Sequence, residues 1–453
     1  MRVMGTTESL AQWIVATSYA DIPAAAYEQA KKSILDFLGT AIQGSTTELG
    51  RMIADFTEEQ GGTPQARVIA TKIRTAAASA AFANGALGHA EDFDDLGGIG
   101  GHPAIVLTPP ALALAEELHL SGREVLAAWV VGYEVGTRLS TNLHPDRDWH
   151  PTAIFGAMAS AVVASKLLRL DVQKTRMALG IAGSQASGLR RNFGTMTKPF
   201  HPGHAARSGV VAAKLAAKGF TADPDIIEGR QGYADNFGGA KCNLPAVTKF
   251  LGDLYHLVSE GTRVKPWPCC GGNHQTLTGL LDLLRTHAIS PDDVELIEHI
   301  GPNVPCTGAL LRDEVHQGLE GKFCLRYNIA AAVIDGKIDL DTFTDKRADQ
   351  GDIQALMARV RLTRNPDVSL RRPHIADGNP EARLLVKMRD GRVHDMVLQP
   401  AMHLTGDAVV DKFRANAAYV FDRERIARPI QLVQRLEAVA DVGELMDAVT
   451  VPR

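Results

Sequence analysis

The first half of the chain alternates apolar segments at helical spacing with short polar breaks. Ile34, Leu38 and Ile42 recur every four residues, which is the spacing of one helix face. Alanine-rich segments of the same texture, separated by Gly, Pro and polar residues, predict helices over residues 75–89, 111–118, 123–139, 153–168, 173–182 and 205–218. Small residues on these faces permit close approach of neighbouring helices. We therefore expect a large all-helical domain over residues 1–262.

The pattern changes after Val264, where segments with alternating apolar and polar residues, typical of strands, occur between helical segments. VELIEHIG and VRLTRN predict strands, and RLLVKMRDGRVHDMVL predicts a hairpin with a tight two-residue turn at Asp390-Gly391. Helices are predicted near residues 275–286 and 325–334.

These elements predict a smaller α+β lid domain over residues 263–405. The tail, residues 406–453, becomes helical again from Val409 and is expected to pack back on the helical domain. The predicted fold class is mainly α, with a large all-helical domain and a smaller α+β lid domain.

Composition narrows the possible partners. The 453 residues are 45% hydrophobic and carry a formal net charge of −4, so the chain provides no field that would attract nucleic acid or a membrane. The N-terminal segment lacks the pattern of a secretory signal, and no apolar run approaches the roughly 20 residues of a membrane span. We expect a cytoplasmic protein whose partners are small molecules or copies of itself.

The five cysteines are an odd number without a C-x-x-C pair, which favours reduced thiols. Cys269 and Cys270 are adjacent and poorly placed for a structural disulfide. The other thiols are too far apart in the sequence to favour an iron–sulfur cluster.

The stretch GHAEDFDDLGGIGGHPA, residues 88–104, places four carboxylates beside a glycine-rich loop and one histidine. A divalent-metal site would use Asp92 and Asp95 at i,i+3, as in helical prenyl-diphosphate enzymes. The second metal motif of such enzymes is missing, and the loop lacks the Lys-Ser/Thr of a phosphate loop. In metal-free acid–base chemistry, like charges would raise the pKa of Asp92, and His102 would exchange protons. A solvated acidic helix end is the plain structural alternative.

Two further loops combine a lysine with prolines and histidines. KPFHPG begins at Lys198 and leads into the predicted helix that carries Arg207, while KPWPCCGGNH runs from Lys265 to His274 before another helix. A helix N-terminus beside a fixed ammonium can receive an anion. His-Pro pairs, which suit turns before helices, occur at His102, His144, His150 and His201.

DFDD…GHPA, NFGTMTKPFHPGHAARSG, KPWPCCGGNH and KFCLRYNIAAAVIDG, in this order, resemble the MmgE/PrpD family over essentially the whole chain. Its members include 2-methylcitrate dehydratase, cis-aconitate decarboxylase and iminodisuccinate epimerase. The resemblance implies a helical domain, an α+β lid, a homodimer and no metal or organic cofactor. It also implies a site for a small polycarboxylate between the domains.

The resemblance also implies the site residues. The catalytic ones would be Asp92, His102, His150, Lys198 and Tyr327, and Lys265 would bind the substrate. From the residues themselves, His201, Arg207 and His274, which stand in or after the two lysine loops, are further candidates for substrate binding. The lysines would hold carboxylates, the histidines would donate hydrogen bonds or protons, and Asp92 would orient a histidine or act as base. Asp94 and Asp95 are interpreted as caps that anchor the loop. Leu96 stands where the decarboxylase pattern has a threonine.

These features predict a cofactor-independent acid–base lyase that acts on a small di- or tricarboxylate through a carbanion next to a carboxylate. It would be 2-methylcitrate dehydratase-like or cis-aconitate decarboxylase-like. An epimerase or isomerase of an iminodisuccinate-like dicarboxylate is the alternative. Alternatives of another class are a metal-dependent diphosphate enzyme and a non-catalytic polycarboxylate binder.

Overall fold

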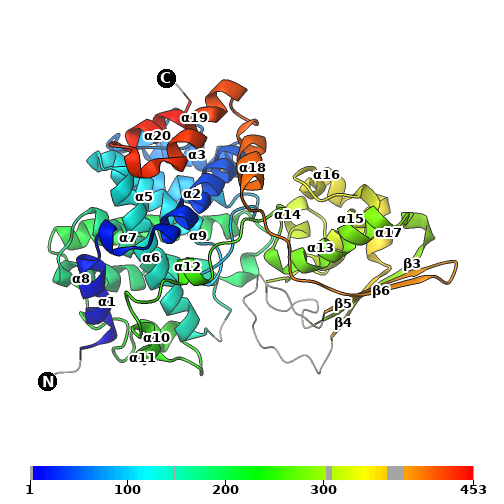
Figure 1. Cartoon of the computed structure of the whole chain (residues 1–453), viewed down its shortest axis with the longest axis horizontal. Helices are drawn as coiled ribbons and strands as arrows, with labels where there is room; N and C mark the ends of the chain where they lie inside the picture. The colour runs from blue at the N-terminus through cyan, green and yellow to red at the C-terminus, as the bar shows by residue number, and fades with distance from the viewer. Residues whose placement is uncertain (1–3, 146–147, 302–308, 365–381, 452–453) are drawn as a thin grey trace.

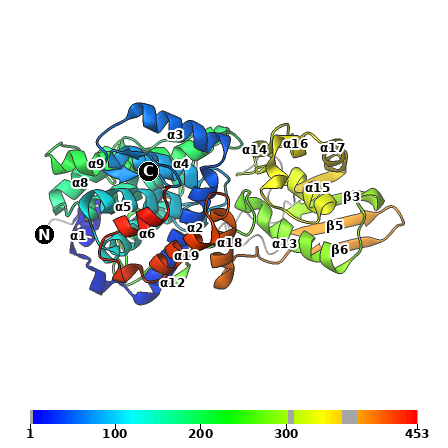
Figure 2. The ribbon, with the colours of Figure 1, turned by 90° about the horizontal axis from the view of Figure 1, so that it is seen from above.

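The computed structural model describes residues 4–145, 148–301, 309–364 and 382–451. A large helical unit and a smaller unit of helices and one sheet lie side by side along the long axis (Figure 1, Figure 2). Each unit has its own hydrophobic core, with Trp129 in the first and Val386 in the second. The mainly α fold class with a smaller α+β part is confirmed. The exact domain limits remain predictions.

The helical unit begins with twelve helices among the described residues. They are α1 (Thr6–Ala16), α2 (Ala24–Gly44), α3 (Glu48–Gln60), α4 (Ala77–Gly88), α5 (Ala104–Leu118), α6 (Gly122–Leu143), α7 (Pro151–Leu167), α8 (Val172–Gly183), α9 (Thr197–Ala217), α10 (Tyr233–Phe237), α11 (Leu244–Val247) and α12 (His256–Ser259). An antiparallel ribbon pairs β1 (Ala66–Arg67) with β2 (Arg74–Thr75). The six helices predicted from alanine-rich periodicity are all present.

Small residues let α9 approach its neighbours closely. A Cβ added to Gly209 on α9 would lie 2.4 Å from the carbonyl carbon of Ser160 on α7. A Cβ on Gly203 would lie 2.6 Å from the carbonyl oxygen of Phe82 on α4. The backbones of α4, α7 and α9 therefore almost touch, as the small-residue faces predicted.

Helix α5 begins seven residues before its predicted start because it continues through Pro109 and Pro110. Proline has no N–H, so Pro110 leaves the carbonyl of Val106 without its helical donor. The hydroxyl of Ser160 on α7 donates to that carbonyl at 2.7 Å instead. A tertiary hydrogen bond thus permits a helix that the sequence pattern alone would end.

Helix α9 also begins earlier than predicted, at Thr197. The KPFHPG segment, interpreted from its prolines as a loop, forms the first turns of the helix. Pro199 is the third helical residue, where no intrahelical N–H bond is required, and Pro202 removes one bond further along. Lys198 therefore lies within the first turn and not on a preceding loop.

The smaller unit combines helices with a four-stranded sheet of order β4-β3-β5-β6. β3 pairs in parallel with β4 and antiparallel with β5, and Figure 1 shows α13, α15 and α17 covering one face of the sheet. The elements are α13 (Gly271–Thr286), β3 (Val294–Gly301), α14 (Gly318–Gly321), α15 (Leu325–Asp335), α16 (Asp345–Ala348), α17 (Gly351–Met357), β4 (Val360–Arg364), β5 (Arg383–Met388) and β6 (Val393–Val397).

The predicted hairpin is present between β5 and β6, but its turn is longer than two residues. The Met388 N–H donates to the carbonyl of Arg392, which encloses three residues. Gly391 takes the left-handed position, with φ of 90°. Such a three-residue loop matches the twist of the flanking strands about as well as the predicted two-residue turn.

The chain returns to the helical unit after the sheet. The last helices are α18 (Asp407–Ala417), α19 (Arg423–Gln434) and α20 (Gly443–Ala448). Phe413 and Ala417 of α18 belong to the core of the helical unit, and Gly39 of α2 lies directly beneath Phe413.

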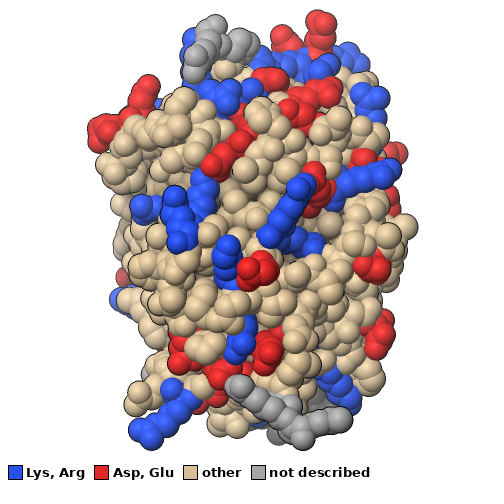
Figure 3. All heavy atoms as spheres, turned by 90° about the vertical axis from the view of Figure 1, so that its left-hand side faces the viewer, with Lys and Arg blue, Asp and Glu red and all other residues tan. Residues whose placement is uncertain are grey.

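Charged side chains of both signs are interspersed on the face in Figure 3, which is the end of the helical unit remote from the sheet. None of the described helices combines the length and apolar character needed to span a bilayer.

Gly209→Ala should lower the free energy of unfolding by about 2 kcal/mol or more, because its Cβ would overlap the backbone of α7. Chemical denaturation measures this change. Gly351→Ala is the matched control: it also lies in a helix, a Cβ there meets nothing within 4 Å, and stability should change by less than about 0.5 kcal/mol. Equal effects of the two substitutions would contradict the close helix packing.

Candidate active site

The acidic stretch forms a buried loop at the end of α4. His89 caps the C-terminus of that helix, and Asp92 adopts a left-handed backbone with φ of 50°. Asp92, Asp94 and Asp95 are at most 3% exposed. The plain interpretation as a solvated helix end is therefore wrong, because these carboxylates lie inside the protein.

The carboxylate of Asp92 lies between two buried ammonium groups. Its Oδ1 is 3.1 Å from Nζ of Lys198 and 2.9 Å from Nζ of Lys265. Burial favours the neutral acid, but these two cations hold the pKa of Asp92 well below its usual value. We predicted a pKa raised by like charges, and that prediction is wrong because the nearest charges are positive.

Asp95 is the acid whose pKa is raised. Burial, together with the nearby carboxylates of Asp36 and Asp94, lifts it well above the ordinary value. Its Oδ1 accepts the Ala104 N–H at 3.1 Å, at the start of α5. Asp95 thus anchors the loop, as predicted, and its surroundings favour the neutral acid.

Asp94 bridges two histidines through its two carboxylate oxygens. Oδ1 lies 2.6 Å from Nδ1 of His89, and Oδ2 lies 2.8 Å from Nδ1 of His102. Although burial opposes ionisation, these histidines hold the pKa of Asp94 well below its usual value, so its oxygens can only accept hydrogen bonds. His102 Nδ1 also lies 3.0 Å from the carbonyl oxygen of Asp95, which likewise can only accept. Each histidine then carries its proton on Nδ1 and presents the lone pair of Nε2.

His89 links the Asp94 bridge to Lys198. Its Nε2 lies 2.5 Å from Nζ of Lys198, and burial lowers the pKa of His89 to about 3. The neutral ring therefore accepts a hydrogen bond from the ammonium group. Sequence reasoning missed both His89 and the bridging role of Asp94. Their spacing of three residues before and two after Asp92 was the available signal.

His150 and His201 form a second pair beside this cluster. Their Nδ1 atoms are 3.1 Å apart, and the His150 ring stacks on that of His89 with centroids 6.3 Å apart. Burial and the charge of Lys198 lower both pKa values, to about 4 for His201. Both rings are neutral at pH 7.

His274 approaches from the other side, in the first turn of α13. Its Nε2 donates to the Cys269 carbonyl at 3.2 Å, and its buried Nδ1 has no hydrogen-bond partner among the described residues. Burial and the charge of Lys265 lower its pKa to about 3. The segment from Lys265 to His274 thus lies against the helical unit next to Asp92.

Seven of the nine predicted residues lie in one region. Asp92, Lys198 and Lys265 are in direct contact, and the predicted histidines surround them. Tyr327 is not brought there, because its hydroxyl donates to the Thr342 carbonyl within the smaller unit. Arg207 is not either, because it lies on the exposed side of α9.

Four residues have the donors of a metal site. Ligand atoms of His89, Asp92, Asp94 and His102 lie within 4.8 Å of one another. The space between His89 Nε2 and Asp92 Oδ1 already holds the Lys198 ammonium, and Asp94 takes up both Nδ1 atoms. A divalent cation would have to displace a lysine that is already paired, so the donor set fits an ammonium better than a metal.

The four described cysteines are free thiols, namely Cys242, Cys269, Cys270 and Cys324. Cys306 lies outside the described residues. Burial raises the pKa of Cys270 to about 11, so this thiol stays protonated beside the site.

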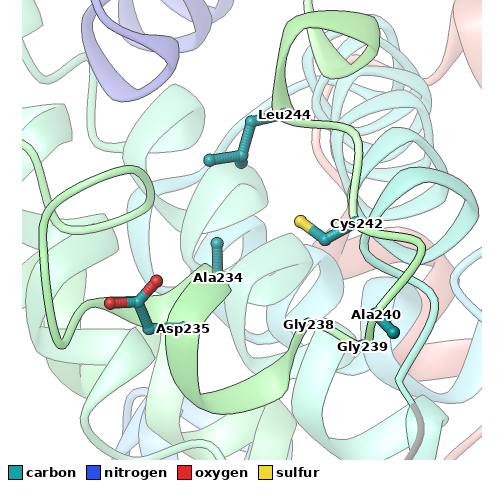
Figure 4. Close-up of a pocket in the computed structure, with 7 residues that line it drawn as sticks. All are labelled: Ala234, Asp235, Gly238, Gly239, Ala240, Cys242 and Leu244. Carbon is teal, nitrogen blue, oxygen red and sulfur yellow. The ribbon is translucent and has the colours of Figure 1, made fainter.

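A hollow of about 430 Å³ lies elsewhere in the helical unit, and its lining consists of Ala234, Asp235, Gly238, Gly239, Ala240, Cys242 and Leu244 (Figure 4). Its described lining carries the carboxylate of Asp235 and the thiol of Cys242, and no cation. It is therefore unsuited to a polycarboxylate.

The fold and site define a two-unit helical protein with cationic and imidazole side chains buried between its units. Residues 8–243 match the MmgE/PrpD N-terminal domain and residues 267–438 the MmgE/PrpD C-terminal domain, so the chain belongs to the MmgE/PrpD family.

Curated relatives match over nearly their whole length. The cis-aconitate decarboxylase of Mus musculus is 27% identical over 98% of this chain and 93% of its own. That of Homo sapiens is 28% identical over 98% and 94%, and the cis-aconitate decarboxylase-like protein oryM of Aspergillus oryzae is 28% identical over 97% and 96%.

Acidification from pH 7 to 5 should destabilise the fold through its buried histidines. His89 and His274 have pKa values of about 3 when folded, against about 6.5 when unfolded. The unfolded chain therefore takes up protons first, and the stability is complete above pH 6.5 and lost as the pH falls towards 3. Each histidine contributes up to about 1.4 kcal/mol per pH unit.

The raised pKa of Asp95 opposes this loss of stability on acidification. A comparison of the wild type with a variant that lacks one histidine therefore isolates the contribution of that histidine. Calorimetry should show a smaller loss of Tm between pH 7 and 5 for His274→Gln than for the wild type. Identical slopes would show that His274 titrates normally in the folded protein.

Proposed function

We propose that this protein is a lyase that removes carbon dioxide from a small unsaturated tricarboxylate such as cis-aconitate. The observation that carries the proposal is the buried meeting of Lys198, Lys265 and neutral histidines around Asp92. Two fixed cations suit a substrate with several carboxylates. The names of the curated relatives support the same reaction class.

In this reaction, the bond between carbon and one carboxylate breaks and carbon dioxide leaves. The electron pair stays on the substrate, next to a remaining carboxylate, and a proton must then be added to carbon. Lys198 and Lys265 stabilise the added negative charge, which is worth most in a site closed to water. The substrate carboxylates compete with Asp92 for these two ammonium groups.

His102 is the proton-transfer group of this proposal. The Asp95 carbonyl at 3.0 Å and the nearby Asp94 carboxylate hold its Nδ1, so Nε2 lies 3.6 Å from Asp92 Oδ1 and can exchange a proton. Burial and the lysines lower the pKa of His102. An anionic substrate acts in the opposite direction and favours the protonated ring, which then delivers its proton to carbon.

An epimerase or isomerase of a dicarboxylate is the second candidate, and Leu96 favours it. Leu96 is joined to Arg263 by two backbone hydrogen bonds of 2.7 and 2.8 Å, and its side chain packs against Gly271 at the start of α13. This position offers no hydroxyl to a third carboxylate. Dehydration of a 2-methylcitrate-like hydroxy acid uses the same carbanion and remains a further alternative.

Proton NMR in D₂O with cis-aconitate, citrate, 2-methylcitrate and iminodisuccinate in separate tubes tests the proposal. We expect loss of carbon dioxide from cis-aconitate and deuterium in the product. Exchange without conversion would favour the epimerase, and a new vinyl signal from a hydroxy acid would favour the dehydratase. A ligand that raises Tm but gives no product would indicate a binder.

Lys198→Ala is the matched variant for this assay, and we expect its kcat/KM to fall by at least about 100-fold. Lys218→Ala, at the exposed end of the same helix, should retain wild-type activity. A chelator should not change the rate, whereas inhibition would favour a metal-dependent enzyme. Sedimentation of both variants tests the homodimer, which stays a proposal, as does the cytoplasmic location.

A further inference from the structure

Three successive backbone carbonyls of the acidic loop each accept a hydrogen bond from a buried lysine. Lys322 Nζ donates to the Glu91 carbonyl at 3.1 Å, Lys265 Nζ to that of Asp92, and Lys412 Nζ to that of Phe93 at 2.6 Å. The three lysines are at most 6% exposed. We call Lys265, Lys322 and Lys412 the lysine clamp.

The members of the clamp come from three distant parts of the chain. Lys322 directly follows α14 in the smaller unit, and its Nζ also lies 2.7 Å from Glu91 Oε2 and 2.8 Å from the Pro268 carbonyl. Lys412 lies on α18, and its Nζ is 2.7 Å from Asp36 on α2 and 3.9 Å from the centre of the Phe93 ring. Each ammonium group thus also has a partner outside the loop, the Pro268 carbonyl for Lys322 and the Asp36 carboxylate for Lys412.

The loop needs such external donors. Asp92 has φ of 50°, a conformation that is unfavourable for a residue with a Cβ and persists only where its surroundings enforce it. The carbonyls on either side of it lie in part-buried positions, where a hydrogen-bond donor is needed in place of water. Ammonium groups provide strong, charge-assisted hydrogen bonds, whereas a free loop would relax to an unstrained backbone.

The geometry points to Lys322 and Lys412 as positioning residues of this site: by holding the carbonyls of Glu91 and Phe93, they place the Asp92 carboxylate between Lys198 and Lys265. Neither of the two contacts the Asp92 carboxylate in the described structure, so they act through the backbone of the loop. Their effect on turnover rests on the proposed function, while their effect on the loop does not.

The test compares Lys322→Met and Lys412→Met with the wild type in two assays. Turnover should show kcat lowered by about 10- to 100-fold with KM changed much less, since a misplaced catalytic group slows chemistry more than binding. Peptides that cover residues 88–97 should exchange their amide hydrogens at least about ten times faster than in the wild type. Each protein is measured at a temperature equally far below its own Tm.

Lys31→Met is the matched control. Lys31 is 8% exposed, and its ammonium also donates to a backbone carbonyl, that of Gln434 at 3.1 Å, with no described contact to the acidic loop. Both its kcat and the exchange of residues 88–97 should match the wild type. A purely structural role of buried lysines would affect all three variants alike.

Lys322→Gln and Lys412→Gln serve if a methionine variant does not fold. They keep an amide NH2 donor group but lose the charge, and we expect a smaller increase in exchange of the same peptides. Folded variants with wild-type kcat and wild-type exchange would overturn the proposal. If the wild type converts none of the substrates, the proposed reaction fails, and the exchange data alone decide whether the clamp positions the loop.

Discussion

The carboxylate of Asp92, held between the ammonium groups of Lys198 and Lys265, is the interaction on which this site depends. An unpaired charge is costly to bury, so neither lysine could remain ionised inside the protein without a partner. The two lysines lie far apart in the sequence, one in the first turn of α9 and one in the segment before α13. Their common partner therefore brings the helical unit and the smaller unit together at one point.

The surroundings of three neighbouring carboxyl groups shift their pKa values in different directions. Cations or histidines hold the pKa values of Asp92 and Asp94 low, whereas burial and two neighbouring carboxylates raise the pKa of Asp95. Burial and the positive charge of the lysines favour the neutral form of the histidines. Such a site gains a proton most readily when an anionic substrate enters. Charge on the substrate thus prepares the acid that the reaction needs.

Much of the architecture follows from the sequence, because the helices bury alanine-rich faces and the strands alternate. The predicted starts of two helices and the length of one turn were wrong, because tertiary contacts override local rules there. Prolines near their N-terminal ends led us to predict later starts for α5 and α9. The Ser160 hydrogen bond explains the longer α5, and the first-turn position of Pro199 explains the longer α9. The turn before Arg392 is likewise one residue longer than the Asp-Gly pair indicated.

The sequence predicted the lysines and histidines that stand in motifs. It did not predict which side chains become their partners. The meeting of Asp92, Lys198 and Lys265 was expected, but the sign of the Asp92 pKa shift was not, because the sequence does not give distances between loops. The partner of Tyr327 was not predictable for the same reason: its motif is present, and its hydroxyl donates to the Thr342 carbonyl within the smaller unit.

A crystal structure with bound propane-1,2,3-tricarboxylate, an inert analogue of the proposed substrate, tests the central claim most directly. Our account predicts that its carboxylates lie within hydrogen-bond distance of both Lys198 Nζ and Lys265 Nζ, with His102 Nε2 facing the carbon chain. An analogue bound elsewhere, with both lysines still on Asp92 alone, would contradict it.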